Sequence, residues 1–114
     1  MNFLLVGLGG FLGATVRYGV SLLFTTSSFP WATLIVNVLG CAGIGWLSYN
    51  RSLFPQPWIL FLIPGVLGGF TTFSAFGFET VRLFQNEEWL LAVLNILSNL
   101  VFGLSAIFLV SKNF

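Results

Sequence analysis

One stretch of sequence decides the fold: Gly65-Val66-Leu67-Gly68-Gly69-Phe70-Thr71-Thr72-Phe73-Ser74-Ala75-Phe76. It lies inside an apolar segment that is long enough to cross a bilayer, yet its glycines and adjacent threonines make a poor regular helix. Non-helical backbone at membrane depth is tolerated only where protein covers it or where it lines a wet cavity. We therefore expect this span to break near Gly68 and Gly69, and we expect function to reside at the break.

The composition of the whole chain predicts an integral membrane protein. Of its 114 residues, 57% are of hydrophobic type and only 6% are charged, whereas a soluble domain carries about 25% charged residues. The formal net charge of +1 offers no basic surface for nucleic acid. No signal peptide stands apart from the first apolar segment, which runs past the usual length and lacks a basic start.

The apolar residues fall into segments that are each about as long as a transmembrane helix requires. The segments run from about Phe3 to Phe24, Trp31 to Tyr49, Trp58 to Phe84 and Trp89 to Val110. Short polar or proline-bearing breaks separate them, and tryptophans stand near their ends, where indole rings favour the membrane interface. The sequence thus predicts an all-α fold of four transmembrane helices in one domain, residues 1–114.

The distribution of basic residues does not predict which way these helices insert in the membrane. Arg51 and Lys112 belong to the side that holds the amino terminus, whereas Arg17 and Arg82 belong to the opposite side. The positive-inside rule needs an imbalance. Either helix hydrophobicity fixes the orientation, or the chain inserts both ways and works as an antiparallel pair.

Several residues in the first two spans are candidates for a packing role or for a functional one. Gly9 and Gly13 have the spacing of a helix-packing motif. Arg17 either reaches the headgroups, or it faces a vestibule, caps carbonyls or attracts an anion. Asn37 shares a helix face with Thr33, and its amide either joins helices or lines a pore as an anion donor.

Later polar and aromatic residues are equally ambiguous. Phe73 and Phe76, three residues apart, either pack in a core or turn their positive ring edges to a small anion. Glu79 is interfacial or lines a pathway. Asn95 and Asn99 form one stripe with Gly103, which is a polar track or a helix seam. Cys41, the lone cysteine, is expected to pack, and a transition-metal site is not expected.

Three motifs in order resemble the CrcB/Fluc family of fluoride channels over the whole chain. They are Gly9-Gly10-x-x-Gly13-Ala14-x-x-Arg17-Tyr18, Thr33-x-x-Val36-Asn37-x-x-Gly40, and the stretch from Gly65 to Phe76. The resemblance implies an antiparallel, dual-topology dimer with two pores in the cell membrane, a prokaryotic plasma membrane by expectation, and passive export of fluoride.

The resemblance also implies roles for individual residues. Asn37 would be the pore amide, and Phe73 and Phe76 would contact fluoride with their ring edges. The carbonyls of Gly68 and Thr71 from both subunits would ligate a central structural sodium ion. The remaining positions would line the pathway or its vestibule: Thr33, Ser74, Glu79, Asn95 and Asn99 on the pathway, and Arg17 at the vestibule.

Two departures from the family pattern concern the subunit composition. Ala75 stands where the family commonly has a hydroxyl residue, and the fourth span carries the stripe Asn95, Asn99, Gly103 instead of an aromatic or histidine followed by serine. Because Asn37, Phe73 and Phe76 are all present, we expect a homodimer, with a heterodimer of related subunits as the alternative.

Two rival functions fit four short membrane helices. A small dual-topology drug exporter needs a carboxylate deep in a membrane helix, but the first two spans contain none and Glu79 is late in the third. A non-conducting membrane assembly subunit is the second rival. An enzyme is not expected, because no nucleophile–base pair or metal set is visible.

Overall fold

The computed structural model describes residues 1–111, and these residues form helices joined by short connections without any strand. The first half of the chain contains α1 (Asn2–Ser21), the 3₁₀ turn η1 (Leu22–Phe24), α2 (Trp31–Tyr49) and the 3₁₀ turn η2 (Arg51–Leu53). The second half contains α3 (Gln56–Leu60), the π-helix η3 (Phe61–Leu67), α4 (Gly68–Phe70), α5 (Phe73–Gln85) and α6 (Trp89–Ser111).

These elements make four spans that are long and apolar enough to cross a membrane. Their bounds are Asn2–Phe24, Trp31–Tyr49, Gln56–Gln85 and Trp89–Ser111. The outer faces carry many exposed large apolar side chains, such as Phe3, Phe11 and Phe108, which would be unfavourable in water and suit lipid. The predicted all-α membrane fold is therefore confirmed, with span ends shifted by at most two residues.

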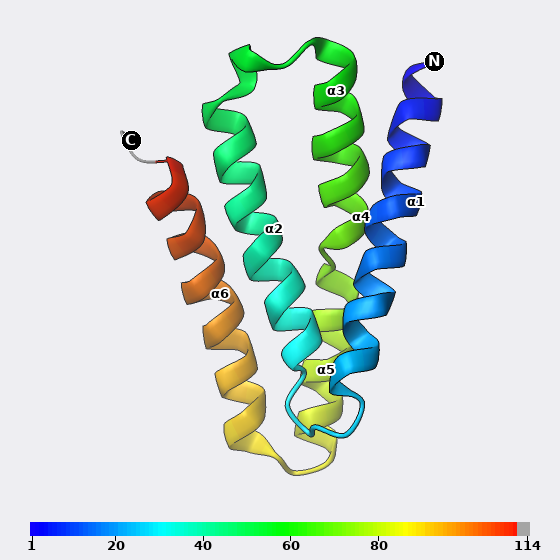
Figure 1. Ribbon diagram of the computed structural model, residues 1–114. Helices are drawn as coiled ribbons and strands as arrows, with labels where there is room; N and C mark the ends of the chain where they lie inside the picture. The colour runs from blue at the N-terminus through cyan, green and yellow to red at the C-terminus, as the bar shows by residue number, and fades with distance from the viewer. Residues whose placement is uncertain (112–114) are drawn as a thin grey trace.

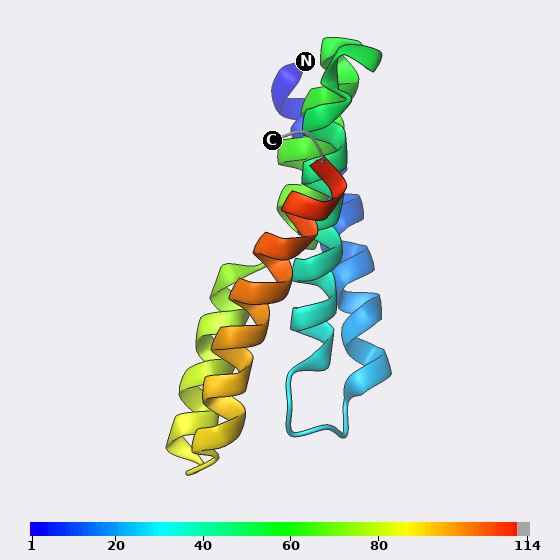
Figure 2. The ribbon, with the colours of Figure 1, turned by 90° about the vertical axis from the view of Figure 1, so that its left-hand side faces the viewer.

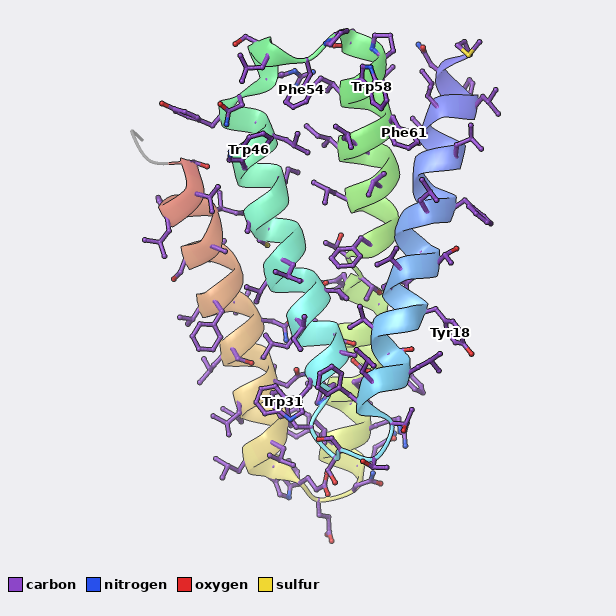
Figure 3. The ribbon with its side chains drawn as sticks, in the orientation of Figure 1. Tyr18, Trp31, Trp46, Phe54, Trp58 and Phe61 are labelled. Atoms are coloured by element: carbon purple, nitrogen blue, oxygen red, sulfur yellow. The ribbon has the colours of Figure 1, made fainter. Side chains whose placement is uncertain are left out.

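The four spans run up and down as neighbours, so that the start of α1, the α2–α3 connection and the end of α6 share one end of the molecule (Figure 1). Aromatic rings mark both ends. Trp46, Phe54, Trp58 and Phe61 lie toward the α2–α3 end, whereas Tyr18 and Trp31 lie toward the other (Figure 3). Trp46 and Phe54 stack edge to face with centroids 6.0 Å apart, an arrangement that favours the interface region.

The third span is broken, as predicted, but the break lies after the glycines. Gly68 and Gly69 remain helical in α4, and the chain becomes extended at Thr71 (φ −86°, ψ 157°) and Thr72 (φ −152°, ψ 121°). The expectation of a break at Gly68 and Gly69 is thus wrong by about three residues. Gly69 packs closely on Gly10 and Ala14 of α1, whereas the two β-branched threonines adopt the extended backbone that suits them.

The helix ahead of the break is also irregular, a feature that was not predicted from the sequence. Pro64 lies inside the seven-residue π-helix η3, and the N–H of Gly68 donates to the carbonyl of Ile63, five residues earlier. A proline has no N–H and its ring clashes with the carbonyl four residues before it, so the α pattern cannot run through Pro64. A wider turn accommodates the ring.

Two kinds of packing hold the spans together. Helix α1 packs on η3 and α4, where glycines of both partners meet backbone to backbone. Helix α2 packs along α6, and α5 packs on α6. Figure 2 shows α5 and the adjoining half of α6 leaning away from α1 and α2, so the bundle opens where the third span breaks.

Candidate functional site

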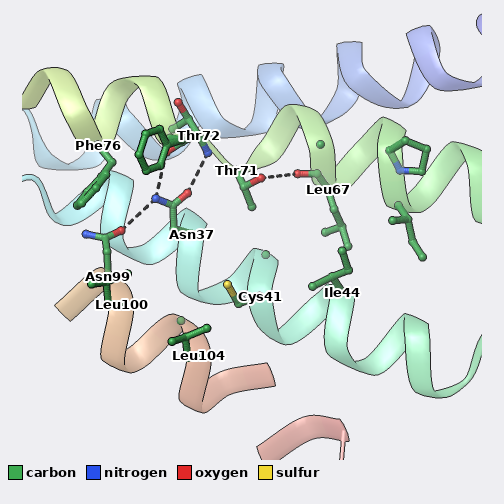
Figure 4. A pocket seen from close by; sticks show the side chains of 16 residues that line it. Asn37, Cys41, Ile44, Leu67, Thr71, Thr72, Phe76, Asn99, Leu100 and Leu104 are labelled. Carbon is green, nitrogen blue, oxygen red and sulfur yellow. Dashed lines mark hydrogen bonds between the residues drawn. The ribbon is translucent and has the colours of Figure 1, made fainter. Parts of the chain in front are cut away.

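The break is held by a side chain from another helix. On α2, the Oδ1 atom of Asn37 accepts a hydrogen bond from the Thr72 N–H at 2.9 Å, and its Nδ2 donates to the Thr72 carbonyl at 3.1 Å (Figure 4). One carboxamide thus gives both backbone groups of Thr72 a hydrogen-bond partner. The clasp interpretation of Asn37 is correct in this respect.

Thr72 also begins the next helix. It is the N-cap of α5, and its hydroxyl accepts a hydrogen bond from the Ala75 N–H at 3.1 Å. Its Oγ1 lies 3.3 Å from the hydroxyl of Ser74. A threonine followed by a helical run is a recognised helix start, so this role was readable from the sequence, although it was not among the predicted roles.

Among the carbonyls that lose their helical partners at the break are those of Gly68 and Thr71. In a continuous helix the Gly68 carbonyl would accept from Thr72 N–H, which instead bonds Asn37. The Thr71 carbonyl would accept from Ala75 N–H, which instead bonds the Thr72 hydroxyl. Within residues 1–111, neither carbonyl accepts a hydrogen bond from a neighbouring helix or connection. Free carbonyl oxygens in a dry interior are good ligands for a hard cation.

Two other carbonyls near the end of α4 are capped by side chains. Arg17 on α1 donates from Nε to the Gly69 carbonyl at 3.0 Å, and the hydroxyl of Thr71 donates to the Leu67 carbonyl at 2.9 Å. A cation at a helix C-terminus is favourable because the macrodipole is negative there. Arg17 therefore contacts the broken helix, which is the carbonyl-capping alternative among its predicted roles.

A chain of hydrogen bonds continues from Asn37 across the bundle. Its Nδ2 also donates to Oδ1 of Asn99 at 3.0 Å, and Nδ2 of Asn99 donates to the carbonyl of Asn95 at 2.9 Å and to its Oδ1 at 3.1 Å. Nδ2 of Asn95 donates to the Thr80 hydroxyl at 2.8 Å, which donates to the Phe76 carbonyl at 2.7 Å. This amide chain joins α2, α6 and α5.

A cleft of about 570 Å³ opens beside the break, between α2, α6 and the third span. Its walls are mostly apolar, and Figure 4 shows the Asn37 and Asn99 carboxamides and the Phe76 ring in it. Phe73 and Phe76 stand at the α5 side with ring centroids 5.6 Å apart and a 50° interplanar angle. The lining residues that also carry polar side chains are Asn37, Thr71, Thr72 and Asn99.

A second, smaller cavity of about 360 Å³ lies by the α1–α2 connection. Glu79 and Arg82 of α5 line it, together with hydroxyl residues of that connection. The Oε1 atom of Glu79 is buried and has no hydrogen-bond partner among residues 1–111, and the buried Thr33 is its neighbour. This cavity has the position and polarity of a vestibule.

The structure brings together only part of the residue set that the sequence suggested. Six of the predicted residues line the cleft: Asn37, Gly68, Thr71, Phe73, Phe76 and Asn99. Glu79 lines the second cavity, Thr33 is buried beside Glu79, and Asn95 is fully buried between α5 and α6 at 0% exposure. Thr80, which orients Asn95, was missed because no sequence spacing links it to a residue 15 positions away in another helix.

Comparisons with known proteins agree with this architecture. The family model described as "CrcB-like protein, Camphor Resistance (CrcB)" matches residues 4–110. A protein of Ruminiclostridium cellulolyticum called fluoride-specific ion channel FluC is 47% identical over 115 residues, covering 96% of this chain and 88% of its own. Proteins with the same name are 46% identical in Elusimicrobium minutum (94% and 88% covered) and 39% identical in Paramagnetospirillum magneticum (96% and 91%). This chain therefore belongs to the CrcB family.

Proposed function

We propose that this chain is the subunit of a fluoride channel that lets fluoride cross the cell membrane passively, down its gradient. One observation supports this most: the Asn37 carboxamide and the rings of Phe73 and Phe76 meet in one cleft at the break of a membrane span. The relatives carry the name of a fluoride-specific ion channel and come from bacteria, which agrees with a prokaryotic plasma membrane and with the expectation that the chain is not an enzyme.

The physical task is to replace the water around a small anion. A bare charge is strongly disfavoured in a low-dielectric interior unless partners replace its hydration. Conduction also requires that the site releases the ion again. Carboxamide N–H groups and aromatic ring edges satisfy both needs, because they are attractive to an anion but carry no formal charge that would trap it.

The phenylalanine pair suits the ring-edge role. Phe73 is 82% exposed in the single chain, and Phe76 is half-buried beside the cleft. The 50° angle between the rings turns them out of a face-to-face stack, so that the edge of at least one ring is available to an ion between them. Their side chains would replace water around an ion at the α5 side of the cleft.

We propose further that two copies assemble as an antiparallel homodimer. The cleft beside the break is open at one side, and a highly exposed phenylalanine stands at its rim. The balanced basic residues agree with insertion in both orientations. A second copy would close the cleft and make two pathways, one on each side. A heterodimer with a paralogue is the alternative, and activity of the purified chain alone decides between them.

A sodium ion fits the free carbonyls of Gly68 and Thr71, and we propose these two oxygens from each subunit as its ligands. The fit rests on the chemistry of the donors, because both carbonyls lack their helical partners. Two oxygens from one chain are too few for a hard cation, so the site would be completed by the second copy. When bound, the ion supplies a fixed positive potential near the pathway and joins the subunits.

Polar residues away from the cleft would form the approach to it. Glu79 and Arg82 line the second cavity, and Thr33 lies beside Glu79. Ser74 is exposed and bonded to Thr72, at the start of α5. These residues would replace part of the water around the ion on its way from the vestibule to the cleft. Arg17 would hold the end of α4 in place.

The test is a fluoride-electrode measurement on liposomes that contain only this purified chain. We expect rapid fluoride efflux that protein-free vesicles do not show. A drug exporter would instead give pH-dependent transport of an organic cation, and an assembly subunit would give neither flux. Activity without a second protein would also support the homodimer.

A further inference from the structure

The two carboxamides that border the cleft have no free N–H group. A carboxamide has two N–H donors. Those of Asn37 go to the carbonyl of Thr72 and to Oδ1 of Asn99. Those of Asn99 go to the backbone carbonyl and Oδ1 of Asn95. In this arrangement neither carboxamide offers an anion a free donor, and the group facing Asn37 is an oxygen, which repels an anion.

The direction of these hydrogen bonds is set outside the cleft. Asn99 turns its oxygen toward Asn37 because two oxygen atoms of Asn95 hold its nitrogen. Asn95 is itself fully buried, and its Nδ2 is fixed by the hydroxyl of Thr80 at 2.8 Å. A residue that touches neither the cleft nor an anion therefore determines which atom of Asn99 faces the pathway.

The same side chains can hold the opposite direction. If the Asn99 carboxamide turns over, its N–H groups face the cleft and its oxygen faces Asn95. Asn95, turned over likewise, donates to that oxygen, and its own oxygen accepts from the hydroxyl of Thr80, since amides and hydroxyls both donate and accept. The Asn95 carbonyl keeps the hydroxyl of Ser98 at 3.3 Å. The Phe76 carbonyl loses one hydrogen bond, the one that it accepts from the Thr80 hydroxyl.

We propose that Asn99 is a specificity-determining residue of the anion pathway and that Asn95 is its positioning residue. An entering anion takes the place of the Asn99 oxygen at the Asn37 amide, and the hydrogen bonds from Asn99 through Asn95 to Thr80 reverse their direction. This inference rests on the proposed function. A small anion that accepts strong hydrogen bonds from two N–H groups offsets the reversal, whereas a larger, weaker acceptor such as chloride does not.

Substitutions of the same shape test the two roles by flux. Leucine matches asparagine in outline but neither donates nor accepts. We expect Asn99→Leu and Asn95→Leu each to lower fluoride efflux about tenfold, as expected for the loss of one well-formed hydrogen bond in the conducting state. Because both residues act on one step, the double variant should be no slower than the slower single variant. Additive losses would contradict a shared step.

The sharper test follows the amide groups of the wild-type protein itself. The full chain, labelled with ¹⁵N-asparagine and placed in lipid nanodiscs, is titrated with fluoride and, separately, with chloride. We expect the Nδ2 signals of Asn99 and Asn95 to shift together with fluoride and to stay fixed with chloride. Asn50, whose Nδ2 donates to the Trp46 carbonyl at the far end of α2, is the internal control and should not move.

The outcomes separate this inference from the proposed function. If fluoride moves the Asn99 signal while Asn95 stays fixed, or moves neither, the reversal does not occur, even where wild-type vesicles release fluoride. If the vesicles release no fluoride at all, the proposed function itself is wrong. In Asn99→Leu, the fluoride-dependent shift of Asn95 should disappear, because the anion reaches Asn95 only through Asn99.

Discussion

Two helix–helix interfaces of this small bundle, here called the glycine seam and the amide seam, are packed in opposite ways. Where α1 meets η3 and α4, glycines such as Gly13 and Gly69 bring backbones together with no room between them. Where α2 meets α6 and α5, carboxamides such as Asn37 and Asn99 bridge the helices and a cleft remains beside them. The glycine seam gives rigidity, and the amide seam gives a hydrogen-bonded chain of carboxamides and space beside it. Chemistry is therefore expected on the second seam alone.

The largest effect should come from breaking the glycine seam. A Cβ at Gly13 would meet the carbonyl of Val66 and lie 2.8 Å from the Phe70 nitrogen, and backbone cannot swing aside as a side chain does. We expect Gly13→Val to lower the free energy of unfolding by about 3 kcal/mol or more, leaving little folded protein. Size-exclusion chromatography and thermal melting in detergent measure this.

The matched control for that change is Gly19→Ala on the same helix, where a Cβ meets nothing within 4 Å. It should purify and melt like the wild type. If Gly13→Val also behaved like the wild type, the two helices would not touch backbone to backbone as described.

The next effect should come from the clasp of the amide seam. Asn37→Asp keeps the acceptor for Thr72 N–H but loses the donors to the Thr72 carbonyl and to Asn99, and a carboxylate repels an anion. We expect fluoride efflux to fall about 100-fold or more, from the combined loss of hydrogen bonds and the added repulsion. Efflux at the wild-type rate would remove Asn37 from the pathway.

Some features of the two seams can be predicted from the sequence, and others cannot. Long apolar runs fix the spans of α2 and α6 almost to the residue, because a bilayer sets their length. The spacing of Gly9 and Gly13 indicates close packing. The position of the break does not follow from glycine content, because Gly68 and Gly69 stay helical, with Gly69 packed against α1, and Thr72 leaves the helix instead.

The partners within the amide seam are equally invisible in sequence. That Asn95 is buried against Thr80, whereas Asn99 borders the cleft, depends on how α5 leans on α6. Both asparagines lie on one helical stripe, and periodicity alone treats them alike. Only tertiary packing separates a cleft-lining residue from a buried one.

A smaller effect should come from the aromatic border of the cleft. Phe73→Ile and Phe76→Ile keep apolar bulk but remove the ring quadrupole. We expect each variant to slow fluoride efflux about tenfold, because the lost ring-edge contact is worth about 1.4 kcal/mol. Size-exclusion chromatography should show that the folded assembly is intact. Phe11→Ile on the exposed face of α1 is the control and should conduct normally. Normal efflux in both cleft variants would show that the rings only pack.

The smallest effect should come from the cap of the break. Thr72→Ala removes the acceptor for the Ala75 N–H and should lower the free energy of unfolding by about 1 kcal/mol. Thr72→Ser keeps the hydroxyl and should melt near the wild type. A thermal melt in detergent compares the three proteins, and equal melting of Thr72→Ala and wild type would mean that α5 does not need this cap.

The most direct measurement of the central claim loads the same vesicles with fluoride and chloride and follows both ions with selective electrodes. With this chain alone in the membrane, fluoride should leave rapidly while chloride stays inside, because only the smaller ion offsets the loss of water at the carboxamides and ring edges. Retention of fluoride as in protein-free vesicles, or release of both halides together, would contradict a fluoride-selective pathway at the break.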